Sequence, residues 1–306
     1  MQITRGKIPS ALKILIYGPE GIGKSTLASR FPDPVFIDTE GSTKQLDVAR
    51  LPAPESWTDI IAQVKYIANT RPCKTLIIDT ADWAEMYCIK ALCGNGSIED
   101  FGYGKGYVML AEKFQALLTE LNNVIDAGIH VVFTAHAQMR KFEQPDEMGA
   151  YDRWELKMQK KTAPLVKEWV DMILFCNYRT HVVTTADNKK KVQGGERVMY
   201  TTHHNCWDAK NRFGLPDVLP MEFESIASVV GSDIPKPKIP ERLKVLMESN
   251  GVSEEELQLL AASKAWVNDS MLPVYKYQPE LIDFIVANWG KVKEMAKANE
   301  TLFEEE

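Results

Sequence analysis

The feature that most constrains this chain is a glycine-rich segment that lies between an apolar run and a helical pattern. Residues 18–25 match the pattern G-x-x-x-x-G-K-[ST]. The apolar run Lys13–Tyr17 precedes the segment, and the helical stretch Lys24–Phe31 follows it. Glycines in this context allow the backbone to wrap closely around phosphates, with successive N–H groups facing them. The segment therefore predicts a phosphate-binding loop between a buried strand and a helix.

This loop implies ATP and Mg²⁺ as ligands. Lys24 is expected to reach the β- and γ-phosphates, and the Ser25 hydroxyl to ligate Mg²⁺. Asp79 ends the most apolar strand, where a carboxylate can orient the metal as a Walker B residue; a turn or helix-capping aspartate is the alternative. The residues predicted to bind the nucleotide are Gly18, Pro19, Glu20, Gly21, Ile22, Gly23, Lys24, Ser25 and Thr26.

Short apolar runs alternate with amphipathic stretches along the first 230 residues. Such runs are typical of strands buried on both faces of a parallel sheet that helices cover. The predicted strands are Lys13–Tyr17, Val35–Asp38, Thr75–Asp79, His130–Thr134 and Met172–Phe175, followed by antiparallel strands at Arg179–Thr185 and Glu196–His203. The predicted helices are Lys24–Phe31, Ser56–Asn69, Tyr107–Asp126 and Pro164–Val170. The fold class expected is α/β, with a mostly parallel central sheet and an antiparallel carboxyl-terminal edge.

The composition changes near Gly231, where a Pro/Lys-rich stretch favours extended chain. We expect an ATPase core over 1–230, a linker over 231–240 and a small helical module over 241–306 with an acidic tail. In that module Pro240 and Pro279 can each open a helix, and Ser253 with Glu256 predicts a capping box.

Charge and cysteine content narrow the functional classes. The formal net charge of −6 gives no global attraction to a polyanion, so contact with nucleic acid requires a local basic patch. Five cysteines without a C-x-x-C pair argue against a disulfide framework and favour a reducing cytoplasm. The chain has no apolar run near 18 residues, so no membrane span is expected.

Polar residues follow two further predicted strands. Glu40 comes after Val35–Asp38 and could polarise an attacking water as a general base, although a solvated loop glutamate is the alternative. His136 lies where another strand leaves the sheet and could sense the γ-phosphate, or could be an ordinary hydrogen-bonded histidine. Gln138 shares that ambiguity.

These residues resemble the RecA-like recombinase ATPases, in particular the short phage-encoded RecA-core proteins of single-strand annealing and recombination. Residues 37–41, Ile-Asp-Thr-Glu-Gly, look like the strand-Asp-x-Glu element that carries the catalytic glutamate of that family, which favours Glu40 as the base. The strand end His136–Gln138 is similar to the family's γ-phosphate sensor. Lys210 and Arg212 resemble the basic-x-basic element that the family presents to the ATP of a neighbouring subunit; on their own, they read as a solvated loop.

The resemblance also implies two loops that hold single-stranded DNA, here Cys93–Gly106 and Arg140–Thr162. Cations mixed with aromatic rings suit single strands, because phosphates take the charge while bases stack on rings. The second loop has such residues, namely Arg140, Lys141, Tyr151, Arg153, Trp154, Lys157, Lys160 and Lys161. It also carries five acidic residues, so a mobile lid or a subunit clasp is the alternative. A further basic spot, Lys189–Lys191, is more typical of a solvated hairpin tip.

The sequence thus predicts a magnesium-dependent RecA-like ATPase that assembles into a filament or ring on single-stranded DNA and promotes recombination or annealing. If the protein is phage-encoded, it would act in the host bacterial cytoplasm. One alternative is a nucleotide-switched interaction, packaging or counter-defence ATPase whose helical module recruits a partner protein. The other is a small-molecule kinase, which would need a lid and an acceptor pocket.

Overall fold

The computed structural model describes residues 5–6, 8, 10–143, 149–184, 190–231, 239–267 and 272–300, with side chains described outside 180–194 and 299–300. The chain divides into two compact units, Met1–Pro235 and Lys236–Glu306. Most of the expected linker, 232–238, lies outside the described residues, as does the acidic tail from 301 onward.

One sheet of nine strands forms the centre of the first unit within the described ranges. Its order is β3-β2-β4-β5-β1-β7-β8-β9, and β6 pairs with β5. The strands are β1 (Lys13–Gly18), β2 (Pro34–Asp38), β3 (Ala49–Arg50), β4 (Thr75–Asp79), β5 (His130–Glu143), β6 (Ala150–Leu156), β7 (Met172–Thr184), β8 (Lys190–Tyr200) and β9 (Val218–Pro220). Pairing is parallel from β3 to β7, whereas β6, β8 and β9 pair antiparallel with their neighbours. The predicted α/β fold class, with a mostly parallel sheet and an antiparallel edge, is confirmed.

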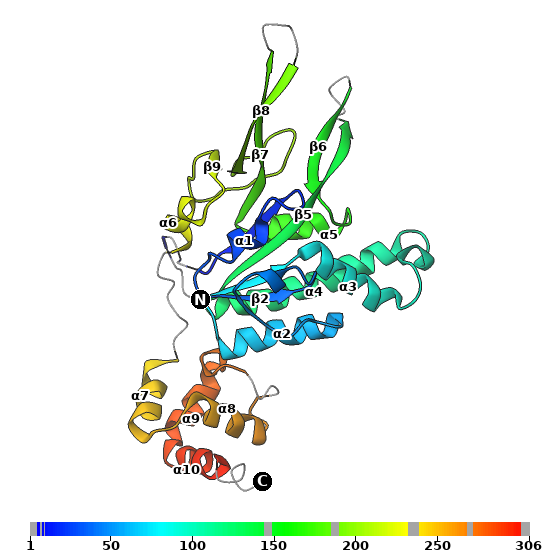
Figure 1. Cartoon of the computed structure of the whole chain (residues 1–306). Coiled ribbons are helices and arrows are strands. Elements are labelled where there is room, and N and C mark those ends of the chain that lie inside the picture. The colour runs from blue at the N-terminus through cyan, green and yellow to red at the C-terminus, as the bar shows by residue number, and fades with distance from the viewer. Residues whose placement is uncertain are drawn as a thin grey trace. The chain divides into compact units, whose positions relative to one another are not determined.

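Helices cover both faces of this sheet. Alternate residues of each central strand point to opposite faces, so apolar side chains on both faces are available to pack against helices. On one face Leu15, Ile78 and Phe133 pack against four helices, α2 (Trp57–Thr70), α3 (Ala81–Cys93), α4 (Lys105–Asp126) and α5 (Thr162–Trp169). On the other face Ile14 and Ile77 pack against α1 (Lys24–Ala28) and α6 (Ala227–Val230). Figure 1 labels these helices. Burial on both faces explains why these strands are almost wholly apolar.

The strand order determines where the site lies. β5 lies between β1, which leads into the phosphate loop, and β4, which ends at Asp79. β2 lies on the other side of β4. All four strands are parallel, so their carboxyl ends open on the same edge of the sheet. Ligands of open α/β sheets bind at this edge.

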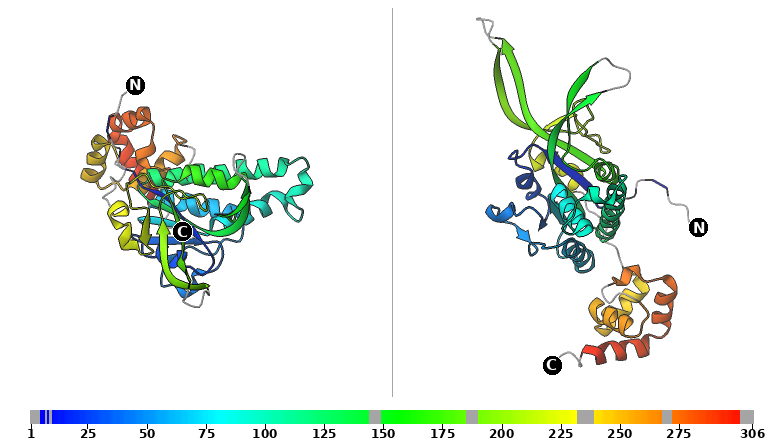
Figure 2. Two further views of the ribbon diagram at one scale, coloured as in Figure 1. Left: turned by 90° about the horizontal axis from the view of Figure 1, so that it is seen from above. Right: turned by 90° about the vertical axis from the view of Figure 1, so that its right-hand side faces the viewer.

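Two long hairpins extend from the same end of the sheet, one formed by β5 and β6 and the other by β7 and β8 (Figures 1 and 2). The first accounts for much of the segment Arg140–Thr162, which the sequence suggested was a loop. β5 continues to Glu143, far beyond the predicted end at Thr134, and its outer residues pair with 150–156. Residues 144–148 and 185–189, including Lys189, lie outside the description.

The remaining elements of the first unit are short. They are η1 (Thr43–Gln45), η2 (Ile98–Phe101) and η3 (Phe223–Ser225). The segment Cys93–Gly106, expected to be the first DNA-binding loop, contains the end of α3, η2 and the start of α4.

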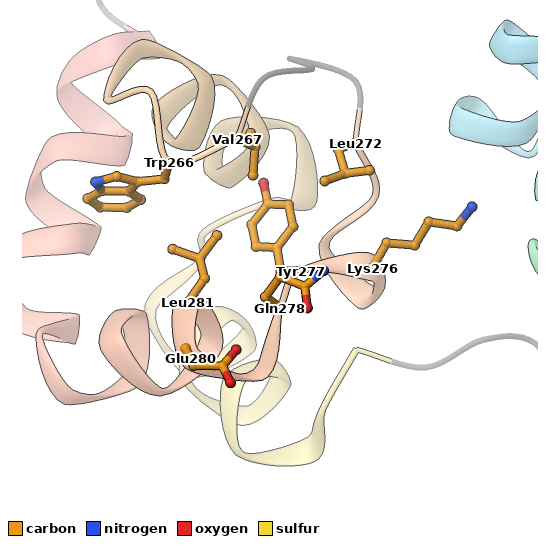
Figure 3. Close-up of a pocket in the computed structure, with 8 residues that line it drawn as sticks. All are labelled: Trp266, Val267, Leu272, Lys276, Tyr277, Gln278, Glu280 and Leu281. Carbon is orange, nitrogen blue, oxygen red and sulfur yellow. The ribbon is translucent and has the colours of Figure 1, made fainter.

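The second unit is helical, with α7 (Glu241–Asn250), α8 (Glu254–Ser263), η4 (Val274–Lys276), α9 (Pro279–Ala287) and α10 (Trp289–Glu300). The capping box predicted at Ser253 and Glu256 is present, and Pro279 begins α9. The unit has its own core, centred on Leu243, Leu257 and Ile285. A cavity of 470 Å³ lies beside Tyr277, Leu272 and Leu281 (Figure 3). None of the described helices is both long and apolar enough to cross a membrane.

Candidate active site

The glycine-rich loop begins where β1 ends, and its three glycines are required for two different structural reasons. Gly18 lies so close to β7 that a Cβ atom there would be 2.2 Å from the carbonyl oxygen of Cys176. Gly21 and Gly23 have φ values of 73° and 104°, in the left-handed region that favours glycine. A Cβ at Gly21 would meet no atom within 4 Å, so open space lies beside the loop. This cradle matches the backbone geometry that phosphates require.

Lys24 is buried at the first position of α1, and its side chain folds back over the loop. Its Nζ donates to the carbonyl oxygens of Gly18 and Pro19, at 3.2 and 3.0 Å. Burial lowers the pKa of Lys24, while the nearby carboxylates of Asp82 and Asp79 oppose that effect. Lys24 therefore lies within the loop, at the position from which it can contact a bound phosphate. Ser25, half-buried, and Thr26, exposed, follow it on α1.

Asp79 ends β4 and is fully buried, and hydroxyl groups from two other elements hold its carboxylate. Thr134 on β5 donates to Oδ1, and Ser42 donates to Oδ2 at 3.0 Å. The backbone carbonyl of Asp79 accepts from the N–H groups of Thr39 and Glu40, at 2.8 and 3.3 Å. These bonds join the end of β4 to the loop after β2.

Asp38, the last residue of β2, shapes the loop that carries Glu40. Its Oδ1 accepts from the N–H groups of Gly41 and Ser42, at 2.7 and 3.2 Å, and its Oδ2 accepts from Thr43 N–H at 3.0 Å. Burial alone would raise the pKa of Asp38, but the hydrogen bond from the Thr43 hydroxyl, at 2.6 Å, and the three backbone bonds outweigh it and hold the pKa below its usual range. The sequence showed Asp38 within the Asp-x-Glu element, yet its role in ordering the loop was missed.

Glu40 and His136 face each other across this edge. Glu40 Oε2 lies 3.9 Å from His136 Nε2, and His136 Nδ1 lies 2.8 Å from Asp82 Oδ2 on α3. Burial raises the pKa of Glu40; His136 opposes this shift, and the carboxylates of Asp79 and Asp82 add to it. A carboxylate that is partly desolvated in this way is a better proton acceptor than a solvated one. His136 is also the residue of β5 that pairs with Gly18, so it lies directly beside the first residue of the loop.

A known protein family matches most of the first unit. Residues 10–213 match the family model described as an AAA domain. That range contains the glycine-rich loop, Glu40, Asp79 and His136. The chain belongs to this family.

One similar solved structure is a KaiC-like protein from the hyperthermophilic archaeon Pyrococcus horikoshii OT3. It is 11% identical in sequence, the match covers 70% of this chain and 91% of that chain, and the TM-score is 0.39. A comparison with curated proteins gave no match.

Other predicted residues of the AAA domain lie away from this cluster. Gln138 Nε2 donates to the carbonyl oxygen of Leu156, at 3.0 Å, within the β5–β6 hairpin. Of the two sensor candidates, His136 is therefore the one placed against Glu40.

Lys210 and Arg212 lie near the amino-terminal ends of the parallel strands. The phosphate loop of the same chain lies at the carboxyl-terminal ends. Lys210 pairs through its backbone with Ile173, near the start of β7, and its Nζ donates to the carbonyl oxygens of Lys167, Glu168 and Val170 at the end of α5. Arg212 Nη1 lies 3.1 Å from Asp171 Oδ1. Within one chain, neither residue joins the AAA domain's candidate active site.

Sequence reasoning missed Arg197, an exposed residue on β8. Arg197 Nη1 lies 3.4 Å from the carbonyl oxygen of Ile22. A Cβ atom at Gly23 would be 2.9 Å from the same Nη1. The Arg197 guanidinium is thus a further positive charge beside the AAA domain's phosphate loop. Nothing local in the sequence marks Arg197, because 175 positions separate it from Ile22.

Proposed function

We propose that the AAA domain binds ATP with Mg²⁺ and hydrolyses it. The observation that carries this proposal is the convergence of Glu40 and His136, 3.9 Å apart, on the edge of the sheet where the phosphate loop and Asp79 also lie. A phosphate-binding loop alone supports nucleotide binding; hydrolysis also needs a group that can activate water. Glu40 is that group here.

The residues present fit both ligands. The left-handed glycines leave the loop open to phosphate oxygens, and Lys24 can turn from the carbonyls of Gly18 and Pro19 towards the β- and γ-phosphates. Ser25 and Asp79 offer the oxygen donors that a hard cation prefers. Bound there, Mg²⁺ would neutralise charge on the β- and γ-phosphates.

Glu40 acts as the general base in this proposal, because burial raises the pKa of its carboxylate while Asp38 orders the loop that carries it. It accepts the proton of the attacking water. His136 faces Glu40 on one side and its own strand pairs with Gly18, so it is placed to respond to the terminal phosphate. Loss of that phosphate would then be transmitted along β5 into the β5–β6 hairpin.

We further propose that the protein assembles into a filament or ring on single-stranded DNA and promotes phage-type recombination or annealing. The β5–β6 hairpin supports this idea, because it carries Arg140 and Lys141 together with the paired rings of Phe142 and Tyr151, whose centroids are 5.6 Å apart. Phosphates would contact the cations while bases stack on the rings. Lys210 and Arg212, remote from their own loop, would act on the ATP of a neighbouring subunit.

The test is steady-state ATP hydrolysis with and without single-stranded DNA, for the wild type, Glu40→Gln and Arg212→Ala. We expect DNA to stimulate the wild type and both substitutions to abolish that stimulation. The matched control is Arg242→Ala, an exposed arginine of the helical unit whose ion pair with Asp283 parallels that of Arg212 with Asp171. Hydrolysis that ignores DNA and survives Arg212→Ala would refute the assembly on DNA and favour a nucleotide-switched interaction protein.

A further inference from the structure

Asp82 is a buried carboxylate that neither the P-loop pattern nor the proposed catalytic roles include. It is the second residue of α3, in the first turn after the N-cap Thr80, and 7% of it is exposed. Both of its oxygens face a single residue of β5. Oδ1 accepts from the backbone N–H of His136 at 2.9 Å, and Oδ2 lies 2.8 Å from His136 Nδ1.

This arrangement fixes which ring nitrogen carries a proton. Burial would raise the pKa of Asp82, but the hydrogen bonds from His136 outweigh it and hold the pKa below its usual range. The start of a helix also favours a negative charge there. An ionised carboxylate can only accept hydrogen bonds, so Nδ1 must carry the proton that it accepts. The other ring nitrogen, Nε2, faces Glu40.

We propose that Asp82 is a positioning residue of the ATPase site: it holds His136 in the Nδ1–H form and directs Nε2 towards Glu40. This inference rests on the proposed ATP hydrolysis. Two bonds to one carboxylate, one from the backbone and one from the ring, fix the position of His136 and the rotation of its ring together. Asp82 itself lies behind the imidazole, so it acts through His136.

The substitution Asp82→Asn tests the assignment because an amide has the same shape but different hydrogen-bonding groups. Its oxygen can still accept from the backbone N–H of His136. Its NH₂ group then faces Nδ1 of the ring and can only donate, so Nδ1 must lose its proton to accept that bond. We therefore expect the neutral ring of His136 to change from the Nδ1–H to the Nε2–H form.

The first measurement is the ring ¹⁵N chemical shifts of the full-length protein labelled at histidine, without nucleotide. His136→Gln identifies the signals of His136 by their loss. Protonated Nδ1 in the wild type and unprotonated Nδ1 in Asp82→Asn would support the proposal. Unprotonated Nδ1 in the wild type, or the same Nδ1 state in both proteins, would overturn it. This readout does not depend on catalysis.

The second measurement is ATP hydrolysis. Partners that orient a functional histidine typically contribute about 10- to 100-fold to activity, so we expect Asp82→Asn to lower kcat by about tenfold or more. KM for ATP should rise by less than about threefold. No hydrogen bond joins Asp82 to Lys24 or to the described residues of the phosphate loop, and removing a negative charge near Lys24 does not weaken the attraction of the loop for phosphate. The matched control is Glu85→Gln, a buried carboxylate one turn further along α3 that accepts from Gln159 N–H and from the Thr162 hydroxyl. Glu85→Gln should leave the ring ¹⁵N chemical shifts of His136 unchanged, and its kcat should stay within about twofold of the wild type.

The two proposals fail in different ways. If the wild type does not hydrolyse ATP under any condition, the proposed function is wrong, and the NMR result alone decides the role of Asp82 in fixing the ring. If the wild type hydrolyses ATP and Asp82→Asn does so with the same kcat, the positioning role is wrong and the proposed function stands.

Discussion

The buried carboxyl of Glu85 predicts a specific pH dependence of stability. Glu85 lies on α3 with 4% of its surface exposed, and it accepts from the N–H of Gln159, at 3.1 and 3.2 Å to its two oxygens, and from the hydroxyl of Thr162. Burial raises its pKa from 4.5 to about 7, although the bonds from Thr162 and Gln159 oppose that shift. Removing this carboxyl, with its shape retained, isolates its contribution.

The sign and size of the effect follow from linkage. The folded state holds its proton up to about pH 7, whereas the unfolded chain releases it near 4.5. The stabilising contribution of the protonated form is therefore complete below pH 4.5 and is lost as the pH rises through 7. A difference of about 2.5 pKa units corresponds to ~3 kcal/mol of unfolding free energy, at about 1.4 kcal/mol per unit.

Glu85→Gln removes the ionisation but keeps an oxygen for Gln159 and adds an NH₂ donor that can bond the Thr162 hydroxyl. We expect its unfolding free energy, relative to the wild type, to increase by up to ~3 kcal/mol between pH 5 and pH 8. Urea unfolding of the full chain at several pH values, followed by circular dichroism, measures this difference. The control is Glu112→Gln, an exposed glutamate on α4. A Glu85→Gln difference that stays constant with pH would refute the reasoning.

Three further substitutions have expected outcomes. Gly18→Ala should destabilise the fold by about 1–3 kcal/mol in urea unfolding, because its Cβ would lie 2.2 Å from the Cys176 carbonyl oxygen; unchanged stability would show that β1 and β7 can separate at no cost. Asp38→Asn should slow ATP hydrolysis by about tenfold or more with little change in ATP affinity. An amide has a single acceptor oxygen and cannot accept all of the N–H bonds from the loop that carries Glu40. A fall in affinity with unchanged kcat would contradict this. Arg197→Ala should weaken ATP binding by about tenfold, measured with a fluorescent analogue, because a cation beside the loop is lost; equal affinity would place Arg197 outside the phosphate site.

Sequence reasoning located most central strands because their residues are buried on both faces. Each of those runs is apolar and short, and each reappears as part of a strand. The prediction failed where a segment is extended because it pairs with a neighbouring strand and not because its side chains are buried in the core. The outer half of β5, Gln138–Glu143, is half-buried or exposed and has no apolar run, and it is extended because β6 pairs with it. The helix α3 was missed as well, although Thr80 caps it through a bond from Trp83 N–H.

The candidate site divides in the same way. The phosphate loop was readable because its nine residues are contiguous and each acts through local backbone geometry. Asp79 and Glu40 were readable as polar residues at the ends of buried strands, since parallel strands bring those ends together. Sequence alone gave no reason to choose His136 over Gln138 or to consider Asp82.

What the sequence determined by itself is the chemistry that acts over a few residues: the glycine-rich loop, the buried strands and the cap at Ser253. Only the tertiary structure decided which distant groups meet. Asp82 and His136 are 54 positions apart, and Arg197 and Ile22 are 175 apart. Such pairs form because of the order of the strands and the packing of helices on the sheet. Hydrogen bonds and burial throughout the fold determine that arrangement, so no local sequence pattern encodes it.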